Sequence, residues 1–92
     1  MKLSYDPEKR RQTLEKRGLD FDEAPIVFAG LHFDVDDDRR DYGERRCITT
    51  GILGDSVVNL VWTPRDGGRR IISMRKARDD ERQRYFERLG GP

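Results

Sequence analysis

The sequence has few of the residues that crosslink a small fold or hold a metal ion, because its 92 residues contain one cysteine and one histidine. A lone thiol cannot form an internal disulfide, and this pair gives no basis for a zinc site. We therefore expect Cys47 to be a small buried side chain, and we expect no metal or other cofactor. The histidine has no serine or cysteine at a recognisable nucleophile position, so a hydrolase triad has no support.

Long apolar segments are missing as well. No run of about 18 apolar residues is present to span a bilayer, and residues 1–7 lack the apolar stretch of a secretory signal. Hydrophobic residues make up 34% of the chain and charged residues 40%, which predicts a thin core under a strongly solvated surface. We expect one cytoplasmic domain over residues 1–92 that avoids membranes and gains stability from a partner.

Charge of each sign is unevenly distributed, although the formal net charge is only +1. Residues 1–44 carry 8 Lys or Arg against 12 Asp or Glu, and residues 45–92 carry 11 against 6. The first part is therefore acidic by four charges and the second basic by five. Basic charge concentrated beside strands is the usual electrostatic footprint of a protein that binds phosphate groups.

The N-terminal third predicts two helices. An Asp-Pro start and the exit at Gly18 bound a charged helix over residues 7–17, in which Leu14 is the obvious core anchor. Capping-box spacing ahead of the apolar run 24–29 predicts a short second helix. Pro25 lies slightly too deep in that helix and is expected to remove one of its hydrogen bonds.

From residue 31 the hydrophobic pattern alternates with period two, as expected of a half-buried strand. Short turns rich in Gly, Asp and Pro separate three further strand candidates, which predicts an antiparallel meander. The four expected strands cover residues 31–35, 45–53, 57–63 and 69–75.

An acidic start and an apolar stripe that includes Tyr85 predict a last helix from residue 79, ended by residues 90–92. The expected fold class is therefore α+β, with two N-terminal helices, a four-stranded antiparallel meander and a C-terminal helix.

Cations concentrate in the last expected strand and just after it. Regular alternation would put Arg75 on one face together with Arg69, Ile71 and Ser73. In the simpler interpretation, the Arg-Lys pair at the end of the strand only extends its long side chains into solvent. The alternative interpretation is a phosphate-binding site. Arg75 is the strongest candidate, because a guanidinium fork makes two charge-assisted hydrogen bonds to a phosphate.

The segment 41–46 (DYGERR) adds a carboxylate and two guanidinium groups where a loop becomes a strand, although a turn with solvated charges is the simpler interpretation. Four residues would supply the groups for RNA cleavage at a 2′-hydroxyl if they meet, namely cations for the phosphorane and proton-transfer groups beside it. These predicted catalytic residues are Glu44, Arg46, Arg75 and Tyr85. The predicted substrate-binding residues are Arg17, Arg45, Arg70 and Lys76.

Motifs spread along almost the entire chain are similar to those of one protein family. They are Tyr5-Asp6-Pro7, Lys16 to Phe21, Asp41 to Arg46, Val61-Trp62-Thr63 and Arg70 to Ala77. With the order of elements, they make the sequence resemble the BrnT toxins of type II toxin–antitoxin systems. The resemblance implies a RelE-like fold and a metal-independent ribonuclease that inhibits translation, with free or ribosome-bound RNA as its target. It also implies a BrnA-type antitoxin that neutralises the toxin and, in complex with it, represses operator DNA.

Three positions depart from that family pattern. Arg17 stands where the family usually has His, and Arg78 stands where it usually has the Ser or Thr that caps the last helix. Pro25 lies inside the second helix, where the family does not usually carry proline. The change at residue 17 motivates a second hypothesis, a non-catalytic binding module that acts in the repressing antitoxin complex. A small interaction domain whose charged helices are only solvated is the third hypothesis.

Overall fold

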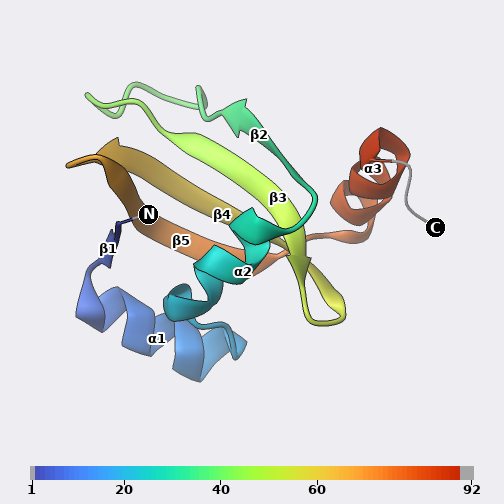
Figure 1. Ribbon diagram of the computed structural model, residues 1–92, viewed down its shortest axis with the longest axis horizontal. Helices are drawn as coiled ribbons and strands as arrows, with labels where there is room; N and C mark the ends of the chain where they lie inside the picture. The colour runs from blue at the N-terminus through green and yellow to red at the C-terminus, as the bar shows by residue number, and fades with distance from the viewer. Residues whose placement is uncertain (1, 90–92) are drawn as a thin grey trace.

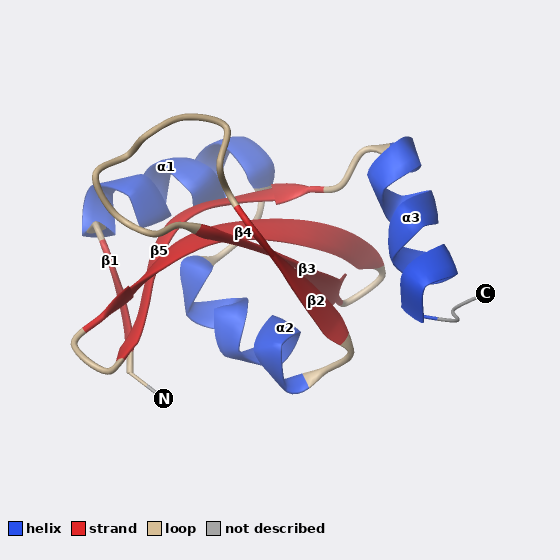
Figure 2. Cartoon of the chain, turned by 90° about the horizontal axis from the view of Figure 1, so that it is seen from above, coloured by secondary structure: helices blue, strands red, loops and turns tan. Residues whose placement is uncertain are grey.

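The computed structural model describes residues 2–89, which form a five-stranded mixed sheet and three α-helices (Figure 1). Helices α1 and α2 pack against β5 and β3, and α3 lies beside one end of the sheet (Figures 1 and 2). In chain order the elements are β1 (Leu3–Tyr5), α1 (Pro7–Arg17), the 3-10 turn η1 (Phe21–Glu23), α2 (Ala24–Ala29), β2 (His32–Asp36), β3 (Cys47–Leu53), β4 (Ser56–Arg65), β5 (Gly68–Lys76) and α3 (Asp79–Leu89). None of the described helices is long and apolar enough to cross a membrane. The expected helix end at residues 90–92 lies outside the described residues.

The first helix has the predicted bounds but not the predicted anchor. The Asp6 side chain accepts from the backbone N–H of Glu8 at 3.0 Å, and Gly18 ends α1 with a left-handed φ of 67°. Leu14 is 44% exposed, so its prediction as a core residue was wrong. Polar contacts hold the helix instead, including the ion pair of Arg10 with Asp20 at 2.7 Å.

The second helix starts later than the capping-box spacing of residues 20–23 suggests, because the 3-10 turn η1 precedes it. The Asp20 side chain caps that turn by accepting from the N–H of Asp22 at 2.9 Å. Pro25 therefore occupies the first turn of α2, where no intrahelical donor is needed. The predicted loss of a hydrogen bond at Pro25 was wrong for this reason.

The antiparallel meander is confirmed for β2, β3, β4 and β5, but the prediction of a four-stranded, wholly antiparallel sheet was wrong. A fifth strand, β1, adds to the sheet edge and runs parallel to β5. Three residues are too few to show alternation in a sequence. Gly68 permits the close approach, because a Cβ there would lie 2.2 Å from the carbonyl oxygen of Lys2.

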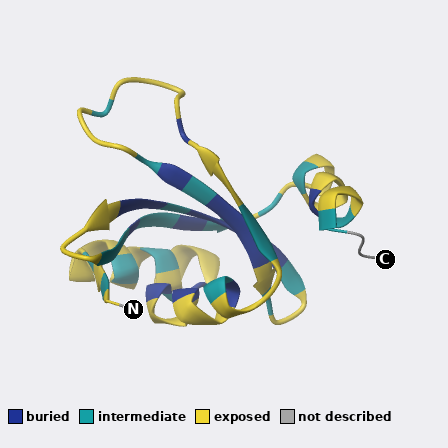
Figure 3. Ribbon diagram, turned by 45° about the horizontal axis from the view of Figure 1, so that its top comes forward, coloured by how far each residue is buried: buried dark blue, intermediate teal, exposed yellow. Residues whose placement is uncertain are grey.

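A β-bulge changes which side chains of β5 share a face. Trp62 pairs with Ile71 and Val61 pairs with Ser73, which leaves Ile72 as an extra residue. The predicted alternation along this strand was therefore wrong, and Ile71 and Met74 are both buried in the core. The core lies between the sheet and the first two helices, and its largest fully buried hydrophobic side chains are Phe21, Val27, Val58, Leu60, Ile71 and Met74 (Figure 3).

The face of the sheet opposite α1 and α2 is here called the open face. Strand register places Phe33, Thr50, Asn59 and Arg75 in one row across it. Cys47 points to the opposite face, where it is 3% exposed, as predicted for a buried thiol, and burial raises its pKa.

Candidate functional site

A groove of about 530 Å³ lies between the open face and α3. Its volume is within the range of small-molecule sites in proteins. The lining residues are Phe33, Val35, Ile48, Thr50, Asn59, Glu81, Arg84, Glu87 and Arg88. The sheet supplies an apolar wall and the helix supplies charges of both signs, so the groove suits a flat, partly polar ligand.

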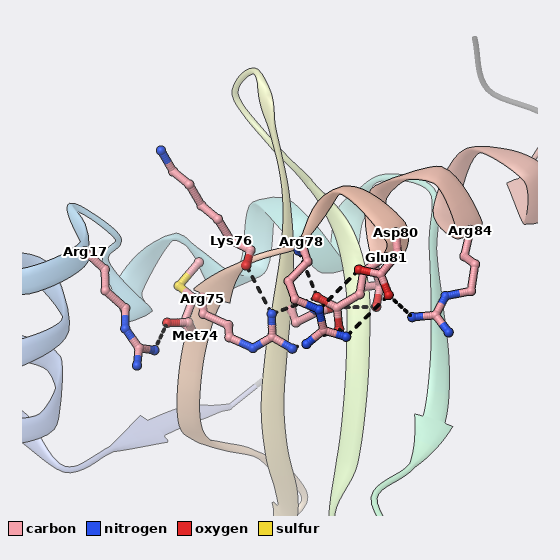
Figure 4. A network of polar contacts seen from close by, with 10 residues as sticks. Arg17, Met74, Arg75, Lys76, Arg78, Asp80, Glu81 and Arg84 are labelled. Carbon is pink, nitrogen blue, oxygen red and sulfur yellow. Dashed lines mark hydrogen bonds and ion pairs between the residues drawn. The ribbon is translucent and has the colours of Figure 1, made fainter.

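Arg75 stands beside this groove and is held by Glu81 of α3 (Figure 4). Its Nη1 and Nη2 atoms donate to the two carboxylate oxygens of Glu81 at 2.8 and 2.9 Å. The Glu81 side chain is only 16% exposed, and Arg75 lowers the pKa of Glu81 to about 2. The same contact raises the pKa of Arg75, so both groups stay charged at any physiological pH.

The contacts of Arg75 use one side of its guanidinium group. Besides Glu81, Nη1 donates to the backbone carbonyl of Lys76 at 3.2 Å. A guanidinium has five N–H donors, and these contacts use three of them. Among residues 2–89 the remaining pair, on Nε and on the outer edge of Nη2, has no partner. Two parallel donors of this kind match two oxygens of a phosphate.

Arg39 brings a second positive charge toward this end of the open face. It donates from Nε and Nη2 to the carboxylate of Asp37 at 2.7 Å each, and that carboxylate is fully buried. Hydrogen bonding from Arg39 lowers the pKa of Asp37 to about 2. The Arg39 charge also acts on Arg75, opposing the rise in pKa that Glu81 causes. Sequence reasoning missed Arg39, because an arginine in a polar loop gives no sign of where that loop folds.

Tyr85 ties α3 to the sheet. Its hydroxyl donates to the carbonyl of Leu31 at 2.7 Å, and its ring stacks on Phe33 with centroids 6.2 Å apart. The residue is 4% exposed, and burial raises its pKa. In this arrangement Tyr85 is a protonated donor that fixes the helix.

The other two predicted catalytic residues lie toward the opposite end of the strands. Glu44 pairs with Nε of Arg46 at 3.1 Å, and the Arg46 guanidinium lies 4.0 Å from the centre of the Tyr42 ring. Cys47, the neighbour of Arg46, pairs with Trp62 of β4. Arg75 pairs with Asn59, which lies three residues from Trp62 along the same strand. Strand geometry then separates the backbones of Arg46 and Arg75 by roughly 15 Å. The four predicted catalytic residues thus form two clusters.

The predicted substrate-binding residues are also dispersed. Arg17 donates to the carbonyl of Met74 at 2.9 Å, at the part of the β5 edge that β1 does not cover, and the Lys76 side chain extends away from Arg75 (Figure 4). Arg45 pairs with Asp36 at 3.4 Å. Arg70, paired in register with Thr63, is on the open face, because its neighbour Ile71 points into the core.

Comparison with known families gives the class of the protein: a ribonuclease toxin of a type II toxin–antitoxin system. The model of the family described as "Ribonuclease toxin, BrnT, of type II toxin-antitoxin system" matches residues 5–81. The chain therefore belongs to the BrnT family, as its motifs predict. This class acts on RNA and has an antitoxin as its partner. A search of curated proteins found no match.

Proposed function

We propose that this toxin cleaves RNA at the Arg75 end of the open face, in a metal-independent reaction that inhibits translation. The observation that carries the proposal is the free fork of Arg75, which Glu81 holds at the edge of the groove. We further propose that a BrnA-type antitoxin neutralises the activity, that the complex binds operator DNA, and that free or ribosome-bound RNA is the target.

In the proposed reaction the 2′-oxygen of one nucleotide attacks the adjacent phosphorus, and the bond from phosphorus to the 5′-oxygen breaks. The 2′-proton leaves to a base, and the 5′-oxygen takes up a proton, so the products are a 2′,3′-cyclic phosphate and a 5′-hydroxyl. Arg75 donates two hydrogen bonds to the phosphate oxygens as negative charge develops on them. Loss of one such donor typically costs about 10²–10³-fold in rate.

The other predicted residues receive different roles. Glu81 orients Arg75, since a carboxylate with a pKa of about 2 is a weak base near neutral pH. Tyr85 positions α3. Because the backbones of Arg46 and Arg75 are roughly 15 Å apart, we propose that Arg46, with its partner Glu44 and with Arg70, binds flanking nucleotides. Water carries the protons in this proposal.

The position of Arg17 supports catalysis over the non-catalytic binding module. Its guanidinium covers a backbone carbonyl at the sheet edge, so replacing a histidine there leaves the Arg75–Glu81 pair in place. We therefore assign Arg17, with Arg45 and Lys76, to the outer part of an RNA-binding surface.

The test is tightly induced expression of the parent and of Arg75→Ala at matched soluble levels, with growth and new RNA ends measured together. Growth arrest with cleaved RNA in the parent alone supports the proposal. Purified parent should also cleave RNA in excess EDTA, and a co-expressed BrnA-type antitoxin should restore growth. Normal growth with a folded, soluble parent would overturn the proposal in favour of the binding module.

A further inference from the structure

We propose that Asn59 reads a base of the RNA, by donating a hydrogen bond from Nδ2 to a carbonyl of guanine or uracil seated in the groove. The inference rests on the proposed ribonuclease function and adds a specificity-determining residue to it.

Asn59 lines the groove, and its buried side chain has an unused donor. The residue lies in the middle of β4 and is 5% exposed. Its Oδ1 accepts from the Thr50 hydroxyl at 2.6 Å. Its buried Nδ2 has no hydrogen-bond partner among residues 2–89. A buried donor without a partner costs stability, and a ligand that supplies an acceptor to Nδ2 would remove that cost.

The surroundings of Asn59 suit a nucleobase. Phe33, Val35 and Ile48 give the groove an apolar wall, and the Arg88 guanidinium lies 4.4 Å from the centre of the Phe33 ring. Single-stranded bases stack on aromatic rings and on arginine planes. An apolar wall beside one polar donor therefore favours a flat ring that carries an acceptor on the edge facing the donor.

The position of Asn59 relative to Arg75 links base and phosphate. The two residues are directly paired across β4 and β5, so their Cβ atoms are about 5 Å apart. A nucleotide whose base reaches Asn59 can therefore place an adjoining phosphate against the free fork of Arg75. Cleavage next to a particular base follows from that arrangement.

The chemistry of the donor selects the base. At the position where guanine and uracil carry a carbonyl oxygen, adenine and cytosine carry an amino group. The Asn59 amide nitrogen donates only, so it pairs with the carbonyl and opposes the amino group. A protein segment is the other possible occupant of the groove. Arg84 and Arg88 in the groove, with Arg75 beside it, outnumber Glu81 and Glu87, and this balance favours a ligand that carries phosphates.

Asn59→Asp provides the sharpest test, because aspartate has nearly the same shape, still accepts from Thr50, and replaces the donor with an acceptor. The substrates are short RNAs that vary the base next to one scissile bond, together with 2′-deoxy analogues that bind but are not cleaved. The parent should favour guanine or uracil at one position by about tenfold to a hundredfold. Asn59→Asp should shift that preference toward adenine or cytosine, and Asn59→Ala should weaken it. Ser73→Ala is the control and should leave the preference unchanged, because Ser73 lines a separate hollow beside α1 and not the groove.

Several results would overturn the inference. If Asn59→Asp cleaves RNA with the same base preference as the parent, Asn59 does not recognise the base. That result would leave the ribonuclease proposal intact. If Asn59→Asp keeps the base preference of the parent but is no longer neutralised by the antitoxin, the groove is a protein interface and not a base-binding site. A parent that cleaves no RNA would refute the proposed function; binding of the deoxy analogues would still report on Asn59, and binding without base preference would refute its role. If Asn59→Asp does not fold, as judged by circular dichroism, unaltered base preference in Asn59→Ala overturns the inference.

Discussion

Glu81 holds Arg75 from the first turn of α3, through two hydrogen bonds of 2.8 and 2.9 Å. The same carboxylate accepts the backbone N–H of Arg78 at 2.9 Å, which is the reach-back contact of a helix N-terminus. One side chain therefore both starts the helix and orients the proposed phosphate-binding group.

Replacing Arg75 by lysine tests whether the shape of the cation matters as well as its charge. Arg75→Lys keeps the positive charge but loses the planar fork, so we expect RNA cleavage to fall about 10²-fold or more. The measurement is the initial rate on a single-stranded RNA with purified protein. Arg11→Lys is the matched control, since Arg11 lies on α1, is 54% exposed and pairs with Glu15 instead of Glu81. Full activity of Arg75→Lys would show that charge alone suffices.

Replacing Glu81 by glutamine should lower both stability and activity. The variant keeps the shape of the side chain but loses the charge that holds Arg75, so we expect a loss of about 1–3 kcal/mol in the free energy of unfolding. Cleavage should fall about tenfold, because Arg75 is no longer fixed. Urea unfolding and cleavage rates are the measurements, with Asp80→Asn as the control. Faster cleavage by Glu81→Gln would mean that Glu81 competes with the phosphate instead of orienting Arg75.

Tyr85→Phe separates a positioning role from proton transfer. The variant keeps the ring stacked on Phe33 and removes the hydrogen bond to Leu31, so unfolding should become easier by about 0.5–1.5 kcal/mol. Its cleavage rate should stay within a few-fold of the parent, with the same pH profile. A loss of about 10²-fold at unchanged stability would instead identify the Tyr85 hydroxyl as a proton-transfer group.

Acid should destabilise the fold through Asp37 and Glu81, whose pKa values are each lowered to about 2. Both carboxyls bind protons more weakly in the folded than in the unfolded chain. Their contribution is therefore fully present above their ordinary pKa values of 3.8 and 4.5, and is lost as the pH falls toward about 2. Urea titrations at several pH values between 7 and 2 measure this. Asp37→Asn should lose less stability over the same acid range, and equal losses would contradict the assignment.

The sequence was sufficient for the elements whose signals are local. The Asp6 cap, the end at Gly18 and the acidic start of α3 gave helix bounds that the structure confirms. The strand β1 was missed because three residues paired in parallel carry no readable period. Leu14 was misplaced because a lone apolar side chain on a charged helix does not show which side meets the sheet.

The candidate site was only partly predictable for a related reason. Arg75 stood out through its chemistry and its place in a basic strand, but its partner Glu81 was predicted only as part of the acidic start of a helix. Arg39 and Asn59 became candidates only after the loop and the sheet face were placed in space. Side chains that gain a role from distant neighbours leave no pattern in a single sequence.

The extra residue in β5 has a consequence for how the positive charges are arranged. Residues five apart on a regular strand point to opposite sides, yet Arg70 and Arg75 share the open face because Ile72 interrupts the ladder between them. An RNA strand that follows β5 therefore meets both guanidinium groups without leaving the sheet. One unpaired isoleucine thus brings Arg70 and Arg75 to the same face, while Arg69 stays over Phe28 and Trp62 on the other.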